Sequence, residues 1–314
     1  MVEIGDVEAA AERIAGHVLR TPTLPSPGLS ALLGVPVTAK LELLQLGGSF
    51  KARGAAAKLL TLTEAERAAG VVAVSGGNHA IGVALMAEAL NVRATVVMPK
   101  TAPARSVEAT RAFGADVRLT DDVTAAFVLT EELQQSGLTL VHPFADPVVL
   151  AGQGTVGLEL SDDADKLTDV LVSIGGGALI SGVAVALTAR RPGIRVWGVE
   201  TEGARTMSDA LAAGRPVPTK LSSFVSTLCA PATSPLAYDH VSTLVTDVLT
   251  VSDSQAVQGT LELAEHAKVW AEPAAGCLMP AARLVLDKVG PDARLGLVLC
   301  GGNAAFSDIV RWSA

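Results

Sequence analysis

Aromatic residues are scarce in this chain, at 3% of 314 residues, although hydrophobic residues make up 49% and the mean hydropathy is +0.43. Small aliphatic side chains are therefore expected to fill the interior. A chain of this length forms one large or two ordinary α/β domains. Its high hydrophobic content excludes disorder as its general state.

Cysteine is also scarce. Cys229, Cys277 and Cys300 are odd in number and widely spaced, which excludes a disulfide framework and favours a reducing, cytoplasmic compartment. The acidic N-terminus, residues 1–6, lacks a signal-peptide pattern. The five histidines show no zinc spacing, and neither a P-loop nor a Gly-x-Ser-x-Gly motif occurs, so no metal or hydrolase site is expected.

The chain has no block of like charge. Its net charge is −8 and its pI about 5.2, and without basic clusters no nucleic-acid partner is predicted. The uncharged run 170–189 is long enough to span a bilayer, but three glycines interrupt it after a short β-branched stretch. A buried strand, turn and helix are predicted there, and no membrane partner.

Short apolar strands alternate with helices along the chain, which predicts an α/β fold with parallel-rich sheets flanked by helices. Strands are expected at 35–43, 71–74, 94–99, 117–119, 139–141, 169–174, 195–199, 247–251 and 295–299. Helices are expected at 7–20, 50–60, 80–90, 104–113, 123–135, 206–213, 252–267 and 274–289. The segment 222–238 is expected to be irregular and to form part of a pocket wall.

Three apolar strands are followed by glycine-rich turns, at 75–79, 175–178 and 300–303, and each turn is expected to open a helix. Backbone N–H groups of such turns bind anions at the carboxyl edge of a parallel sheet, so an anionic ligand is predicted, with 175–177 as the best phosphate cradle. Gly152, Gly154 and Gly157 form a GxGxxG pattern. It lacks both the preceding strand and the downstream carboxylate of a dinucleotide site, so no nicotinamide site is predicted.

Lys51 follows Gly47 and Gly48 at the start of the expected helix 50–60, which Ser49 could N-cap. The helix dipole and the nearby Arg53 would both disfavour an ammonium group there. A lysine with a lowered pKa suits Schiff-base chemistry with a carbonyl. The alternative is an ordinary solvated lysine. His79, in a glycine turn, either faces a ligand or has a capping role.

Together these motifs resemble the fold-type II pyridoxal-phosphate enzymes, in particular the serine/threonine dehydratase and serine racemase branch. The match runs over nearly the whole length of the chain and includes the segments 48–54, 75–79, 142–144, 151–155, 175–177, 198–200 and 272–273. The resemblance implies a two-domain fold like that of the tryptophan synthase β subunit, with the cofactor in the interdomain cleft. Residues 1–69 and 144–314 would form the large domain, with the small domain, 70–143, inserted in it.

The resemblance also implies the cofactor, pyridoxal 5′-phosphate, and the residues that hold it. Lys51 would carry it as a Schiff base (aldimine) beside Phe50, and Asn78 would bond its ring 3′-oxygen. The phosphate would lie on the N–H groups of Gly175, Gly176, Gly177 and Ala178, and Cys300 would contact the pyridine nitrogen. The substrate carboxylate would bind at Ser75, Gly76, Asn78 and His79.

The implied reaction is the dehydration of a β-hydroxy amino acid, threonine, serine or a relative, to a 2-oxo acid plus ammonia, with Lys51 abstracting the α-proton. Gly76 stands where racemases of this family carry a serine, so racemisation is disfavoured. An amino-acid racemase and a non-catalytic pyridoxal-phosphate-binding protein remain the alternatives.

Two other departures limit what the resemblance implies. Glu200 and Ala204 match two ligands of the divalent-metal site of relatives, but Thr206 replaces the third, an aspartate, so no metal is expected. The stretch 226–229 differs from the family's segment near the substrate and leaves substrate choice open. A homodimer is implied, without a readable interface.

Overall fold

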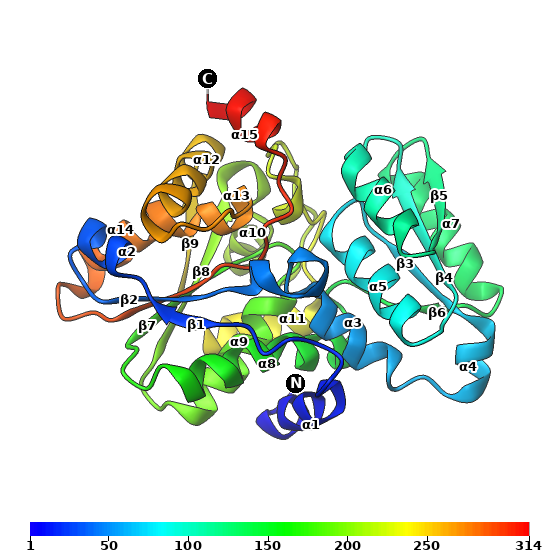
Figure 1. Ribbon diagram of the computed structural model, residues 1–314, viewed down its shortest axis with the longest axis horizontal. Helices are drawn as coiled ribbons and strands as arrows, with labels where there is room; N and C mark the ends of the chain where they lie inside the picture. The colour runs from blue at the N-terminus through cyan, green and yellow to red at the C-terminus, as the bar shows by residue number, and fades with distance from the viewer. Residues whose placement is uncertain (314) are drawn as a thin grey trace.

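The computed structural model describes residues 1–313 and contains two sheets flanked by helices (Figure 1). The six-stranded sheet has the order β1-β2-β10-β7-β8-β9 and the four-stranded sheet the order β5-β4-β3-β6. Every strand pair is parallel except β1–β2. The predicted parallel-rich α/β fold is therefore confirmed.

The strands of the larger sheet are β1 (Thr23–Pro25), β2 (Val37–Lys40), β7 (Asp169–Ser173), β8 (Arg195–Thr201), β9 (Asp247–Val251) and β10 (Leu295–Val298). The smaller sheet contains β3 (Val71–Val74), β4 (Ala94–Pro99), β5 (Asp116–Thr120) and β6 (Thr139–Leu140). All residues of β3, β7 and β10 are buried, as expected for parallel strands covered on both faces.

The first half of the chain contributes helices α1 (Ile4–Ile14), α2 (Pro27–Leu33), α3 (Lys51–Leu59), α4 (Glu64–Ala69), α5 (Asn78–Ala89), α6 (Ala104–Ala112), α7 (Val123–Gln135) and α8 (Pro147–Asp163). The second half contributes α9 (Ala178–Arg190), α10 (Thr206–Ala213), α11 (Pro235–Leu244), α12 (Asp253–Glu262), α13 (Pro273–Gly276), α14 (Leu278–Val289) and α15 (Phe306–Ser313). Helix α3 packs against both α5, beside the smaller sheet, and α8, beside the larger one.

Helix α8 was not predicted, and it contains the whole GxGxxG pattern. Its glycines allow helices to approach closely: a Cβ on Gly152 would lie 2.8 Å from the Cβ of Ala57, and one on Gly157 2.9 Å from the Cβ of Ala186. Because the pattern lies inside a helix rather than in a strand-to-helix turn, it has a packing role and forms no dinucleotide site.

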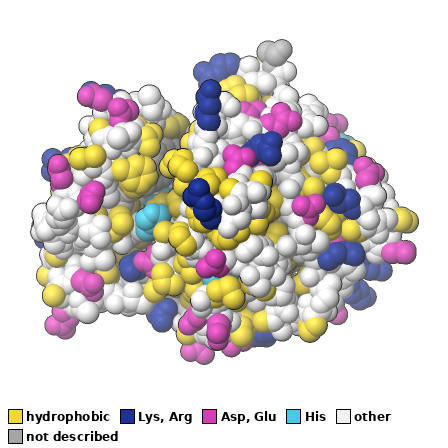
Figure 2. Space-filling view, turned by 180° about the vertical axis from the view of Figure 1, so that it is seen from behind, with side chains coloured by type: hydrophobic (Ala, Val, Ile, Leu, Met, Phe, Trp, Pro, Cys, Tyr) yellow, Lys and Arg dark blue, Asp and Glu magenta, His cyan; other side chains and the backbone are white. Residues whose placement is uncertain are grey.

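The uncharged run 170–189 divides into β7, a glycine turn and α9. Within residues 1–313 no helix has the length and apolar character needed to cross a membrane. On the face drawn in Figure 2, apolar side chains gather near the middle, and acidic and basic side chains are interspersed around them.

Candidate active site

The loop before α3 is fastened to the loop that follows β10. Ser49 forms an isolated antiparallel bridge with Gly301, the N–H of Phe50 donates to the carbonyl of Cys300 (3.1 Å), and the N–H of Gly302 donates to that of Gly48 (2.9 Å). Gly48 has a φ of +74°, a left-handed conformation that favours glycine. The turn at 300–303 does not open a helix, contrary to prediction, because these residues pair with the lysine loop instead.

Lys51 is the first residue of α3 and is half-buried. Its Nζ donates to the carbonyl oxygen of Pro143 (3.1 Å) and lies 5.0 Å from the ring centroid of Phe50. Burial lowers its pKa to about 8, although the nearby Glu272 acts in the opposite direction. The expected low pKa is confirmed, and it makes Lys51 a nucleophilic amine near neutral pH.

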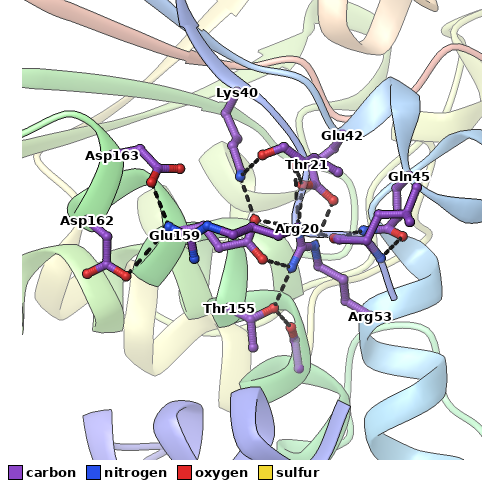
Figure 3. Close-up of polar contacts among 12 residues, drawn as sticks. Arg20, Thr21, Lys40, Glu42, Gln45, Arg53, Thr155, Glu159, Asp162 and Asp163 are labelled. Carbon is purple, nitrogen blue, oxygen red and sulfur yellow. Dashed lines mark hydrogen bonds and ion pairs between the residues drawn. The ribbon is translucent and has the colours of Figure 1, made fainter. Parts of the chain in front are cut away.

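The contribution that was expected from Arg53 was wrong. The guanidinium of Arg53 is directed away, into a buried network where it contacts Glu42 and Glu159 (Figure 3). The expected helix cap was also wrong: Ser49 is extended, and Phe50 occupies the N-cap position without a side-chain hydrogen bond. Desolvation, not a neighbouring cation, therefore acts on the lysine.

The segment 75–79 leads from β3 into α5. The hydroxyl of Ser75 accepts a hydrogen bond from the N–H of Gly77 (3.2 Å), and Ser75 and Gly76 are half-buried. Asn78, the first residue of α5, is buried. His79 is buried as well, its Nε2 is 2.8 Å from the carbonyl oxygen of Val141, and burial lowers its pKa to about 3. It is therefore neutral and offers a carboxylate no positive charge.

The glycine triplet lies between β7 and α9, as predicted. Gly177 has a φ of +100°, and α9 starts at Ala178 with no side-chain cap, so the N–H groups of its first turn are available to an anion. A Cβ on Gly176 would lie 2.2 Å from a ring atom of Phe144, so only glycine fits there. Alanine at 178 is compatible because the residue is already helical.

A buried polar cluster lies behind Asn78. Both carboxyl oxygens of Glu272 accept from Asn78 Nδ2, at 2.9 and 3.0 Å, and the Sγ of Cys300 is 4.0 Å from Glu272 Oε1. Ser173 Oγ donates to the same sulfur (3.4 Å). Burial, followed by the influence of Glu272, raises the pKa of Cys300 to about 12, so Cys300 is a thiol and not a thiolate.

No role was predicted for Glu272, although it is a lone acid within the apolar stretch 270–275. The stretch 226–229 lies where a pocket wall was expected. A Cβ on Gly77 would lie 3.7 Å from Thr227 Cγ2, and one on Gly175 would lie 3.3 Å from the Thr227 carbonyl oxygen. Thr227 is exposed and lies beside both glycine turns.

Glu200 has a structural role in the described chain. Its carboxylate accepts from the N–H of Met207 (2.6 Å) and from the N–H (2.9 Å) and hydroxyl (2.7 Å) of Ser208, at the start of α10. Ala204 is buried beside it. Residues 1–313 contain no group of three or more His, Cys, Asp or Glu side chains that could hold a metal ion.

Comparison with known proteins identifies the class of this site. The sequence model of a family described as pyridoxal-phosphate dependent enzyme matches residues 14–301. The chain belongs to this family. The fold-type II resemblance is thereby confirmed.

Individual relatives are similar over nearly the whole chain. An L-threonine ammonia-lyase of Thermotoga maritima is 38% identical over 314 residues, which are 99% of this chain and 78% of the relative. The structure of maize serine racemase has a TM-score of 0.93 and 32% identity, covering 99% of this chain and 96% of that chain. The crystal structure of a T.th. threonine deaminase has a TM-score of 0.90 and 36% identity, covering 97% and 99%.

The residues of this enzyme fit pyridoxal phosphate. An amine of lowered pKa suits its aldehyde, and the uncapped N-terminus of α9, with glycine where a Cβ would meet Phe144, suits its phosphate. The amide of Asn78 is a donor for a ring oxygen, and the thiol of Cys300 is a neutral partner for a ring nitrogen.

Proposed function

We propose that the protein is a pyridoxal-phosphate-dependent ammonia-lyase that converts a β-hydroxy amino acid, threonine, serine or a relative, to a 2-oxo acid and ammonia. The observation that carries the proposal is the Lys51 amine, whose pKa burial lowers to about 8. It starts the helix that packs beside both sheets. The similarity to an L-threonine ammonia-lyase and to a threonine deaminase supports the reaction type.

When bound, pyridoxal phosphate supplies an electron-withdrawing ring conjugated with the substrate's α-carbon. Lys51 would hold the aldehyde group of the cofactor. Its amine would also accept the α-proton of the substrate at Nζ, because a lysine of lowered pKa is a competent base near neutral pH. The N–H groups of residues 175–178 would hold the phosphate, and the Phe50 ring packs beside the lysine. The neutral thiol of Cys300 would be the partner of the ring nitrogen, and it lacks the negative charge that would keep that nitrogen protonated.

The substrate carboxylate binds at the turn formed by Ser75, Gly76 and Asn78. Gly76 supplies N–H but no side chain, and a Cβ there would lie 3.2 Å from the Cβ of Ala102. Position 76 therefore offers no second acid or base, which favours elimination over racemisation. His79, neutral and bonded to backbone, supports the turn from behind.

The test is release of 2-oxo acid and ammonia from L-threonine and L-serine. Lys51→Ala is expected to abolish turnover, whereas Lys58→Ala, on the same helix but paired with Asp146, is the matched control that retains it. If the wild-type protein bound the cofactor but released no product, the protein would be a cofactor-binding protein and not a lyase.

A racemase is the second candidate, because of the similarity to maize serine racemase. Chiral analysis of recovered L-serine decides between the two: a lyase leaves the remaining substrate in the L form. Accumulation of D-serine at a rate equal to ammonia release would contradict the assignment.

Three further proposals rest on the family resemblance: a homodimer, a cytoplasmic location, and division into residues 1–69 with 144–314 and residues 70–143. The extent of the four-stranded sheet, which begins at Val71 and ends at Leu140, supports the division. Light scattering after gel filtration tests the dimer: a mass near twice 31.9 kDa is expected.

A further inference from the structure

The side-chain amide of Asn78 is held from two sides. Its Oδ1 accepts from Asn303 Nδ2 at 2.9 Å, and its Nδ2 donates to both oxygens of Glu272. Asn303 is itself fixed, because its Nδ2 also donates to the carbonyl of Gly47 at 2.7 Å. A flipped Asn78 would bring its oxygen against the Glu272 carboxyl oxygens and its NH₂ group against another NH₂ group. Both contacts are repulsive.

Glu272 lies close to the backbone of Gly301. A Cβ on Gly301 would lie 2.9 Å from Glu272 Oε1 and 3.2 Å from Asn78 Nδ2, so glycine at 301 makes room for the pair. The N–H of Glu272 donates to the carbonyl of Gly301 (3.0 Å), and the residue is 3% exposed. No step of the proposed reaction uses this carboxyl group.

We propose that Glu272 is a positioning residue for the cofactor, holding the Asn78 amide so that only an N–H donor faces the ligand. An amide nitrogen has two hydrogens, and the two carboxyl oxygens approach the same nitrogen, so one hydrogen serves Glu272 and the other remains for a ligand oxygen. The inference rests on the cofactor role of Asn78 in the proposed function. Glu272 acts through Asn78 and contacts no substrate.

The experiment is a double-mutant cycle read out as the dissociation constant of pyridoxal phosphate, measured by absorbance titration of the apoprotein. Glu272→Leu leaves the buried Asn78 amide without its acceptor, and affinity is expected to fall about 10- to 100-fold. Glu272→Gln keeps an acceptor oxygen and is expected to restore the affinity to within about threefold. In an Asn78→Ala background, Glu272→Leu is expected to change the affinity less than about twofold, because contacting residues are non-additive.

Asp169→Asn is the matched control, since Asp169 is also a buried carboxylate but pairs with Arg195 at the other end of β7. It is expected to lower thermal stability and leave the dissociation constant unchanged. Circular dichroism verifies folding, and Glu272→Ala replaces the leucine variant if that variant does not fold.

Additive effects in the cycle, equal losses for the Gln and Leu variants, or an unchanged affinity for Glu272→Leu would each overturn the inference. The titration needs no turnover. Absence of ammonia release from the wild type would therefore end the proposed function and leave this result standing.

Discussion

Arg53 lies two residues after the reactive lysine, and its replacement by methionine is predicted to destabilise the protein severely. Its guanidinium bonds both oxygens of Glu42 (2.8 and 2.8 Å) and both oxygens of Glu159 (2.7 and 2.8 Å) (Figure 3). The side chains of Arg53 and Glu42 are 0% exposed. Lys40 also pairs with Glu159, so the network contains two cations and two carboxylates and has no net charge.

The magnitude follows from the charge left behind. Arg53→Met keeps most of the side-chain volume but leaves two carboxylates with one cation. Removing one partner of a buried ion pair lowers the free energy of unfolding by about 3–5 kcal/mol. The assay is urea denaturation of the apoprotein followed by tryptophan fluorescence and circular dichroism. Glu42→Gln in the Arg53→Met background removes the surplus charge and is expected to recover a large part of the loss.

The control is the exposed pair between Arg190 and Glu8, whose side chains are 44% and 45% exposed. Arg190→Met is expected to cost no more than about 1 kcal/mol, because solvent screens this pair. If Arg53→Met lowered the free energy of unfolding by less than about 1 kcal/mol, or if adding Glu42→Gln restored none of it, the reasoning would be refuted.

The site supports three other predictions. The rate at which apoprotein captures pyridoxal phosphate is expected to rise with pH with a midpoint near 8, because the neutral Lys51 amine reacts. A midpoint near the ordinary 10.5 in stopped-flow absorbance would contradict this. His79 has a pKa of about 3 in the folded protein against an ordinary 6.5, so the unfolded chain binds more protons between these values and stability falls on acidification through that window. In a series of denaturation experiments at different pH, His79→Gln is expected to reduce the change in unfolding free energy with pH by up to about 1.4 kcal/mol per pH unit. An unchanged pH dependence would show that the imidazole does not contribute. Gly176→Ala is expected to lower the free energy of unfolding by about 1–3 kcal/mol and to weaken cofactor affinity, because its Cβ would meet the Phe144 ring. Gly5→Ala, in open space on α1, is the control and is expected to be neutral or stabilising in the same thermal and cofactor titrations.

Elements with a strong local signal were predictable from the sequence. The strands at 71–74, 94–99 and 247–251 and the helices at 123–135 and 206–213 have the predicted bounds, because β-branched runs or apolar periodicity end at turn residues there. Helix α8 was missed because glycines are unfavourable inside helices, and three of them fall within it. Only the packing against Ala57 and Ala186 shows that they permit close helix contact.

The candidate site was likewise predictable only in part. The lysine loop and the glycine triplet are contiguous motifs, and the motif itself indicates their chemistry. Segment 272–273 matches the family, but the role of Glu272 was not predicted, because its contacts are with Asn78, 194 residues away, and Cys300, 28 residues away. The direction of Arg53 could not be foreseen either, since its carboxylate partner Glu159 lies on the unpredicted α8.

The fastening of residues 48–50 to residues 300–302 has a consequence for biosynthesis. Proteins emerge from the ribosome N-terminus first, so a nascent chain that has reached residue 290 already contains Lys51 and both earlier glycine turns. It still lacks β10 and the loop that anchors the lysine segment. We therefore expect cofactor binding only after translation has passed β10, and we expect chains truncated before residue 300 to lack it.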